Sequence, residues 1–381
     1  MEKQPLSLYL HYPFCVRKCR YCDFLSGPAG EDVRERYVQA LCAQIRAAGA
    51  AHAEEVDTIF FGGGTPSLME PSQAERIMEA VRAAFRMEED AEISLELNPG
   101  TADREKIAAF RSAGINRLSI GVQSLRDGEL RLLGRIHTAQ EARRTCEDAV
   151  RAGFDNWSMD LMSALPGQTL QDWMETLAQA VSLDPPHLSA YSLIIEEGTP
   201  FASMKLPPLP DEETDRAMYH QTGDFLARHG LLRYEISNYA KPGMESRHNS
   251  GYWTGHRYLG LGLGASSCLD GERLRMTDDL QKYLQIAEDP GRALDDSIIA
   301  ERLQRTSRDK MEEFMFLGLR MTAGVSAGTF RERFGVTIDS VYGEVLRKQL
   351  QTGLLIQEED RYRLSERGLD VSNTLMSEYL F

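Results

Sequence analysis

The first half of the chain alternates short apolar segments with segments of helical length, and this alternation constrains the fold more than any other feature. Six strand-length segments are each followed by a polar or Gly/Pro break and then by a longer segment. Consecutive β-then-α units predict right-handed crossovers and a parallel sheet, so we expect an α/β protein with a partial (βα)6 barrel, similar to an incomplete TIM barrel. Strands are predicted at residues 8–11, 56–61, 93–97, 117–121, 157–162 and 187–192, and helices at 71–85, 104–113, 139–152 and 170–181.

Unusual residues gather where the predicted strands end. A cysteine cluster follows the first strand, the sequence GGGTP follows the second, and Glu96 and Asn98 end the third. Gln123 follows the fourth strand, and Asp160 lies on the fifth. Because βα barrels and open α/β sheets bind ligands at the carboxyl ends of their strands, we predict one functional site at this edge.

Beyond the sixth strand the pattern changes, and three domains are predicted: a barrel over residues 1–200, an extension over 201–295 and a C-terminal module over 296–381. In the extension, Asp211 should cap a helix that runs to about His229. The next segments read as a strand over 231–239 and a polar, aromatic loop over 245–258.

The C-terminal module reads as helices followed by a hairpin. The helices are expected near residues 308–321, 326–333 and 339–352, and the hairpin over 354–364. Three helices and a hairpin resemble a winged helix, which raises a DNA-binding regulator as one alternative. From Ala300 onward, however, the chain has 12 basic and 13 acidic residues, so no basic surface dominates.

The cysteines Cys15, Cys19 and Cys22 form the motif C-x3-C-x2-C within eight residues. A structural zinc ion would need a fourth ligand, for which no paired CxxC or HxxxH exists, although His11 could be nominated. A redox CxxC pair would leave Cys15 unexplained. Three thiolates on one loop suit a [4Fe-4S] cluster with one open iron, and zinc is the alternative. The scattered cysteines, Cys42, Cys146 and Cys268, read as buried small hydrophobes.

Charge and hydrophobic patterning exclude several classes of partner. The formal net charge of -15 argues against a nucleic acid and against anionic lipid. No apolar run reaches the roughly 18 residues of a membrane span, and the N-terminus lacks the features of a signal peptide. We therefore expect a cytoplasmic protein.

The segment LYLHYPFCVRKCRYCDF resembles the signature of radical S-adenosylmethionine (SAM) proteins, in the branch similar to the oxygen-independent coproporphyrinogen III oxidase. FFGGGTPS, LELNPGT, RLSIGVQS, LGRIH and MDLMSALPGQT follow in that family's order over essentially the whole chain. The resemblance implies a radical SAM barrel, in which SAM binds the open iron of the cluster and an electron donor reduces it. By resemblance, the SAM pocket would be lined by Tyr9, Tyr21, Gly63, Gly64, Thr65, Glu96, Gln123, Arg135 and Asp160.

Two kinds of protein in this branch must be separated: the oxidase and a group of heme chaperones. The oxidase carries a further cysteine two residues after the third ligand, where this chain has Phe24. It also has a long segment before the cluster, where only fourteen residues precede Cys15 here. Both differences speak against coproporphyrinogen oxidase activity, which stays the alternative, and no catalytic residue is assigned.

The sequence HNSGYW matches the HNxxYW motif that distinguishes the heme chaperones of the branch. The resemblance implies that this chain binds heme and delivers it to a recipient protein such as a respiratory enzyme. An imidazole can ligate heme iron and aromatic faces can pack on a porphyrin, and His256 is the alternative axial ligand. The residues expected to contact heme are His248, Asn249, Tyr252 and Trp253.

Overall fold

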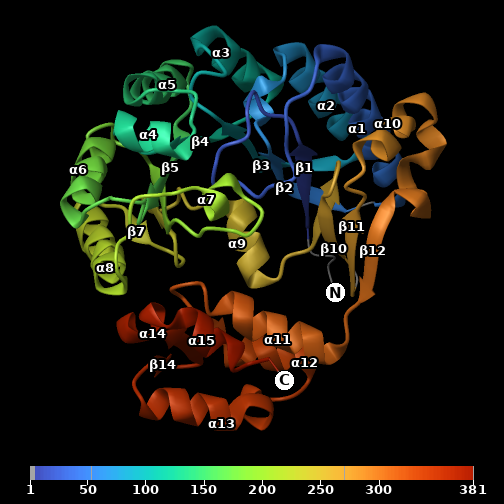
Figure 1. The fold of residues 1–381 in the computed structure, drawn as a ribbon. Coiled ribbons are helices and arrows are strands. Elements are labelled where there is room, and N and C mark those ends of the chain that lie inside the picture. The colour runs from blue at the N-terminus through green and yellow to red at the C-terminus, as the bar shows by residue number, and fades with distance from the viewer. Residues whose placement is uncertain (1–4, 53, 270, 381) are drawn as a thin grey trace.

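The computed structural model describes residues 5–52, 54–269 and 271–380. Six neighbouring parallel strands form the middle of a curved sheet, and helices cover its outer face (Figure 1). The prediction of six β-then-α units in an α/β fold is thus confirmed. The parallel strands are β1 (Leu6–Tyr12), β2 (Glu55–Gly63), β3 (Arg86–Leu97), β4 (Arg117–Gln123), β5 (Asn156–Ser163) and β6 (His187–Ser192).

The outer face of the sheet is buried beneath helices. Alternate strand residues such as Leu8, Ile59 and Leu118 are fully buried in the largest hydrophobic core. The four predicted helices are present, and two further helices, α1 and α4, had not been predicted. The helices of this half are α1 (Glu31–Ala51), α2 (Pro71–Ala84), α3 (Arg104–Ala113), α4 (Asp127–Leu133), α5 (Ala139–Arg151) and α6 (Leu170–Val181), with a short 3-10 turn at Pro66–Leu68.

The middle of the chain extends this sheet at both edges. The helix α8 (Glu212–Arg228) begins after Asp211, whose side chain accepts from the Thr214 amide, as predicted. The single strand predicted over 231–239 is wrong: β7 (Leu232–Arg233) and β8 (Asn238–Ala240) form a short hairpin beside β6, since the chain turns back between them. At the other edge lie β9 (Tyr258–Leu261), β10 (Ser266–Leu269), β11 (Glu272–Met276) and β12 (Ile299–Gln304), with α10 (Leu280–Glu288) and two 3-10 turns, Pro290–Leu294 and Asp296–Ile298, before β12.

The segment predicted as an aromatic loop contains a helix, α9 (Arg247–Thr254). The Ser246 side chain caps it by accepting from the Asn249 amide, and Gly255 ends it in the left-handed conformation. Both caps compensate for the poor helix propensity of Gly251 within so short a helix. The short helix α7 (Pro200–Ser203) precedes α8.

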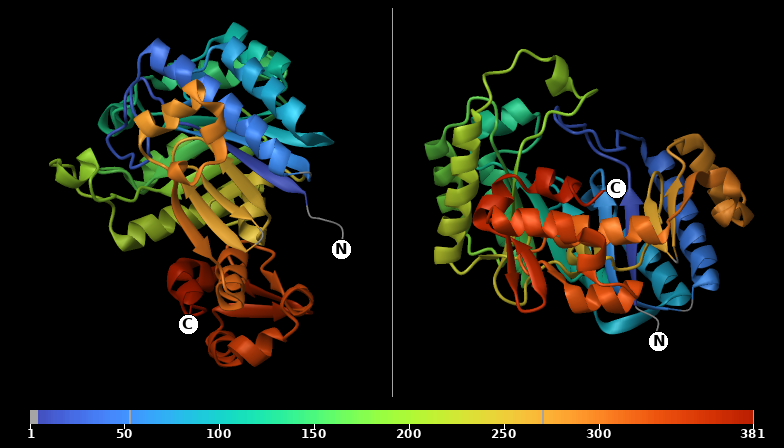
Figure 2. Two further views of the ribbon diagram at one scale, coloured as in Figure 1. Left: turned by 90° about the vertical axis from the view of Figure 1, so that its right-hand side faces the viewer. Right: turned by 90° about the horizontal axis from the view of Figure 1, so that it is seen from below.

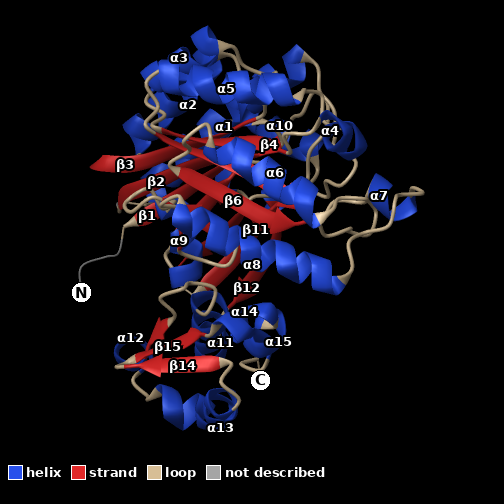
Figure 3. Ribbon diagram, turned by 90° about the vertical axis from the view of Figure 1, so that its left-hand side faces the viewer, coloured by secondary structure: helices blue, strands red, loops and turns tan. Residues whose placement is uncertain are grey.

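The C-terminal module has a hydrophobic core of its own, which includes Phe330, Tyr342 and Leu346. It lies below the barrel (Figures 2 and 3). The predicted helices and hairpin are present, together with a third, two-residue strand. Since β12 pairs with β11, the strand before this module still belongs to the large sheet. Its elements are α11 (Ser307–Gly318), β13 (Val325–Ser326), α12 (Ala327–Phe334), α13 (Ile338–Gln351), β14 (Leu355–Glu358), β15 (Arg361–Leu364), α14 (Glu366–Asp370) and α15 (Ser372–Ser377).

Among the described residues, no helix is both long enough and apolar enough to cross a membrane.

Candidate functional site

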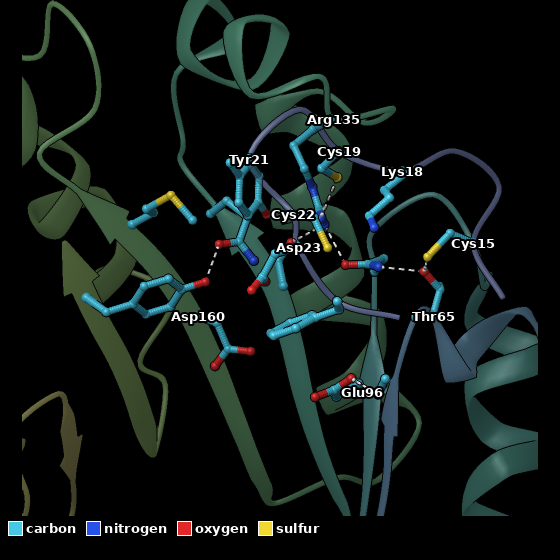
Figure 4. Close-up of a pocket in the computed structure, with 18 of the residues that line it drawn as sticks. Cys15, Lys18, Cys19, Tyr21, Cys22, Asp23, Thr65, Glu96, Arg135 and Asp160 are labelled. Atoms are coloured by element: carbon cyan, nitrogen blue, oxygen red, sulfur yellow. Dashed lines mark hydrogen bonds between the residues drawn. The ribbon is translucent and has the colours of Figure 1, made fainter. Parts of the chain in front are cut away.

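The carboxyl ends of the parallel strands surround a cavity of about 420 Å³ (Figure 4). Each of the six strands, or the segment that follows it, contributes to the lining, as the position of the unusual residues predicted. Of the residues predicted for the cluster and SAM, the cavity is lined by Cys15, Cys19, Cys22, Tyr21, Gly63, Gly64, Thr65, Glu96, Gln123, Arg135 and Asp160.

The three cysteines of the motif are partly exposed at the cavity, whereas the three scattered cysteines are buried. The Thr65 hydroxyl donates to Cys15 Sγ over 3.4 Å, and the Arg135 guanidinium donates to Cys19 Sγ over 3.5 Å. Burial raises the pKa of the Cys22 thiol, so a bound metal rather than the surroundings would keep it ionised. Among the described residues, no three His, Cys, Asp or Glu side chains lie close enough together to hold a single metal ion. The donor set, three thiols on one loop with a hydroxyl beside Cys15 and a guanidinium beside Cys19, fits an iron–sulfur cluster.

One hydrogen-bonded line of side chains crosses the cavity between two of the cysteines. Asn98 Nδ2 donates to the Thr65 hydroxyl over 2.9 Å, and Arg135 donates to Asn98 Oδ1 over 2.5 Å. Arg135 also donates to the Gly121 carbonyl over 2.6 Å, which fixes its guanidinium. Asn98 was not assigned as a site residue, although its place after β3 was the signal that could have found it.

Two carboxyl groups face the cavity on the side away from the cysteines (Figure 4). Burial, and then the charge of Asp160, raise the pKa of Glu96 to about 8, although the Gly63 amide donates to it over 3.0 Å. Asp160 accepts from the hydroxyls of Ser119 over 2.7 Å and Ser158 over 2.8 Å. Since two neighbouring carboxyls are hard to ionise together, a cationic ligand would be stabilised between them.

Gln123 and Tyr191 close another side of the cavity. The Tyr191 hydroxyl donates to Gln123 Oε1 over 2.8 Å, and Gln123 has a φ of 66°, a strained value for a residue that is not glycine. Tyr191 was missed as a site residue. It lies near the end of β6, so the rule that located the others applies to it.

Gly63 and Gly64 are required by the packing of the protein itself. Gly63 has a φ of +117°, and an added Cβ would lie 2.5 Å from the His11 ring. A Cβ on Gly64 would lie 2.7 Å from the Phe14 carbonyl oxygen. These contacts explain both glycines without a ligand, although both also line the cavity.

The predicted contact of Tyr9 with the cavity is not seen. Its ring occupies the space that a Cβ on Gly62 would need, and its hydroxyl lies 3.0 Å from His11 Nδ1. Tyr9 thus packs between β1 and β2 and is not among the residues that line the cavity.

The four residues predicted to contact heme lie on or within α9, outside the lining of this cavity. His248 is 1% exposed and stacks on Phe60, with 5.2 Å between ring centres. Its Nδ1 lies 2.8 Å from the Thr58 hydroxyl and its Nε2 lies 2.9 Å from the Tyr252 hydroxyl. Burial lowers the pKa of His248 to about 3. His248 therefore lies in a helix and not in the predicted loop, and both of its ring nitrogens have partners inside the protein.

Among the remaining residues of the HNxxYW motif, Trp253 contacts the C-terminal module. The guanidinium of Arg320 lies 4.3 Å from the centre of the Trp253 ring. The Asn249 amide donates to the Ser246 hydroxyl. The alternative heme ligand His256 pairs with Asp57, 3.0 Å away. The residues of the motif therefore have structural contacts within the protein, and any contact with a ligand would be additional to these.

Comparison with known proteins adds relatives of both halves of the chain. Residues 9–180 match the model of the radical SAM superfamily, and residues 306–371 match that of the HemN C-terminal domain. The heme chaperone HemW of Bacillus subtilis (strain 168) is 35% identical, over 98% of this chain and 99% of the relative. The heme chaperone HemW of Escherichia coli (strain K12) is 37% identical, over 99% of this chain and 98% of the relative.

A solved structure shares the whole architecture. Coproporphyrinogen III oxidase (HemN) from Escherichia coli, described as a radical SAM enzyme, superimposes with a TM-score of 0.86. The match covers 99% of this chain and 90% of the other, at 23% sequence identity. At this identity the likeness shows a common fold.

Proposed function

The chain belongs to the family of the heme chaperone HemW within the radical SAM superfamily, and on this premise we propose that it binds heme and delivers it to a recipient protein. We propose further that it holds a [4Fe-4S] cluster on Cys15, Cys19 and Cys22 and SAM in the adjoining cavity. The observation that carries the second part is the cavity at the strand ends, where three thiols, a half-buried arginine and a pair of carboxyls converge.

The bound cluster would supply an electron to SAM, and the residues of the cavity would hold and orient both groups. We assign the carboxylate of SAM to Arg135, because a fixed guanidinium recognises carboxylates well. Glu96 and Asp160 would bind the cationic and ribose groups, which offer hydrogen-bond donors. Gly63, Gly64 and Thr65 would contact the methionyl end, and Tyr21 and Gln123 the adenosyl end.

Heme contact by His248 requires a change in α9, since Thr58 and Tyr252 occupy both imidazole nitrogens. We propose that α9 shifts to release His248, with Asn249, Tyr252 and Trp253 packing beside the macrocycle. Replacing Thr58 with Val removes the hydroxyl that holds Nδ1 and should therefore raise heme affinity. Unchanged heme binding in both Thr58→Val and His248→Ala would show that heme does not bind at α9. A His256→Ala variant would then be measured.

The function is tested by one pair of assays on anaerobically reconstituted protein. Heme binding, followed by transfer to a heme-free recipient, should be observed, and coproporphyrinogen III with SAM and a reductant should not be turned over. Multiple turnovers without heme transfer would instead establish the oxidase.

The cluster needs its own control. Alanine at Cys15, Cys19 and Cys22 together should abolish iron and sulfide binding, while alanine at the buried Cys146 should leave it intact. Stoichiometric zinc without charge-transfer absorption in the wild type would refute the cluster.

A further inference from the structure

A line of buried hydrogen bonds runs through the inside of the barrel from the cavity to α9. From Asp160 Oδ1 it passes to the Ser158 hydroxyl over 2.8 Å, and from there to His187 Nδ1 over 2.8 Å. His187 Nε2 lies 2.8 Å from the Tyr234 hydroxyl, which accepts from the Ser246 amide over 3.3 Å. Ser246 is the residue that caps α9. The cavity and the helix of the HNxxYW motif are thus joined by four contacts.

The line is shielded from water along its whole length beyond Asp160. Ser158, His187 and Ser246 are at most 1% exposed, and Tyr234 is 9% exposed. Burial lowers the pKa of His187 well below its usual value, and Arg117 acts in the same direction. The imidazole is therefore neutral, with one proton to donate and one nitrogen that accepts.

Counting donors and acceptors selects one direction for the line. If Tyr234 donates to Nε2, the His187 proton sits on Nδ1 and is donated to Ser158, whose own proton is then donated to Asp160. In the opposite direction the Ser158 hydroxyl would donate to His187 Nδ1. The Tyr234 hydroxyl would then lose His187 Nε2 as its acceptor, and Asp160 Oδ1 would lose the Ser158 hydroxyl as its donor. The Ser189 hydroxyl lies 3.4 Å from the Ser158 hydroxyl, but it has no proton to give there because it donates to Asn238 Oδ1 over 2.6 Å. Buried donors and acceptors left unpaired are costly, so the first direction is favoured.

We propose that His187 is a positioning residue for SAM: in its Nδ1-protonated form it fixes the Ser158 hydroxyl on Asp160, and Tyr234 and the start of α9 hold it in that form. This inference rests on the proposed binding of SAM at Asp160. Tyr234 lies outside the cavity, yet it would affect SAM affinity by fixing the tautomer of His187. SAM binding in the cavity and the position of α9 would then be coupled.

The test replaces Tyr234 with Phe, which keeps the ring and removes only the hydroxyl. His187 is then free to accept from Ser158, so SAM affinity should fall by about threefold to tenfold, as expected for one hydrogen bond. The matched control is Tyr283→Phe, since the buried Tyr283 hydroxyl donates one hydrogen bond, to Gln44, away from the cavity. Titration calorimetry on the anaerobic, cluster-loaded protein should show wild-type SAM affinity in the control.

A double-mutant cycle separates positioning from general stability. Once Ser158 is Ala, the two hydrogen bonds that join His187 to Asp160 are lost, so adding Tyr234→Phe should weaken SAM binding no further. Nitrogen-15 NMR of histidine-labelled protein should show Nδ1 protonated in the wild type and a changed tautomer in Tyr234→Phe.

The outcomes bear on the two proposals differently. Normal SAM binding by the wild type with additive effects of Ser158→Ala and Tyr234→Phe, or an Nε2-protonated His187, overturns the positioning role alone. Failure of the wild type to bind SAM overturns the proposed function and the positioning role together.

Discussion

The affinity for SAM should rise with pH because the Glu96 carboxyl must lose a proton before it can meet a cation. Burial, and then Asp160, raise the pKa of this group to about 8 in the empty cavity. A cationic group of SAM stabilises the ionised form, so that binding releases the proton.

The size of the effect follows from the fraction of Glu96 that is ionised. With a pKa of about 8, roughly 3% of the carboxyls are ionised at about pH 6.5 and roughly three quarters at about pH 8.5. The affinity of the wild type should therefore rise roughly 25-fold over this range, in addition to any dependence that comes from SAM itself.

The assay compares the wild type with Glu96→Gln, which has a similar shape and cannot titrate. Anaerobic calorimetry in buffers of different ionisation enthalpy measures both the affinity and the protons released. The wild type should have the steeper dependence and release more protons. Parallel curves for the two proteins would refute the placement of a cation at Glu96.

The same carboxyl affects stability with a definite sign. Its pKa is raised from 4.5 to about 8 on folding, so between these values the folded protein holds a proton that the unfolded chain has lost. The contribution of Glu96 to the free energy of unfolding therefore falls as the pH rises through this window. Thermal unfolding of the empty protein should show Glu96→Gln gaining stability over the wild type toward about pH 9. An equal difference at low and high pH would contradict the raised pKa.

Three further predictions concern packing. Glu92→Ala removes a buried carboxylate that accepts from the Arg247 and His248 amides at the start of α9, so the free energy of unfolding in urea should fall by about 1–3 kcal/mol, whereas Glu89→Ala on the exposed part of β3 should change little. Phe110→Ala empties a fully buried site and should cost about 3–5 kcal/mol in the same assay; a loss below about 1 kcal/mol would contradict the packing of α3. Arg320→Ala removes the cation over Trp253, and because the other two tryptophans are buried, a red shift of fluorescence should report a loosened contact between α9 and the module.

The barrel could be predicted from the sequence because its signals are local and strong. Outward-facing strand residues are apolar, and the breaks between elements carry Gly, Pro or capping residues, as at Thr138 and Thr169. The cavity followed from one topological rule, that parallel strands bring their carboxyl ends to the same edge. The same rule located Glu96 and Asp160, and applied fully it would have included Tyr191.

The parts that the sequence did not predict depend on contacts between distant segments. Besides its local caps, the start of α9 depends on Glu92, far away on β3, which accepts from its first amides, and no local pattern reveals this carboxylate. The burial of His248 depends in the same way on Thr58. The same holds for β9, where a Cβ on Gly260 would collide with the Ser266 backbone of the neighbouring strand β10. Such pairings are set by the whole sheet.

The most direct test of the proposed site is the electron paramagnetic resonance spectrum of the reduced, reconstituted protein with and without SAM. A cluster on Cys15, Cys19 and Cys22 with an open iron should change its spectrum when SAM binds, and Arg135→Ala should require more SAM for the same change. A spectrum that SAM leaves unaltered, at concentrations where calorimetry shows it bound, would contradict the claim that the cavity brings SAM to the cluster.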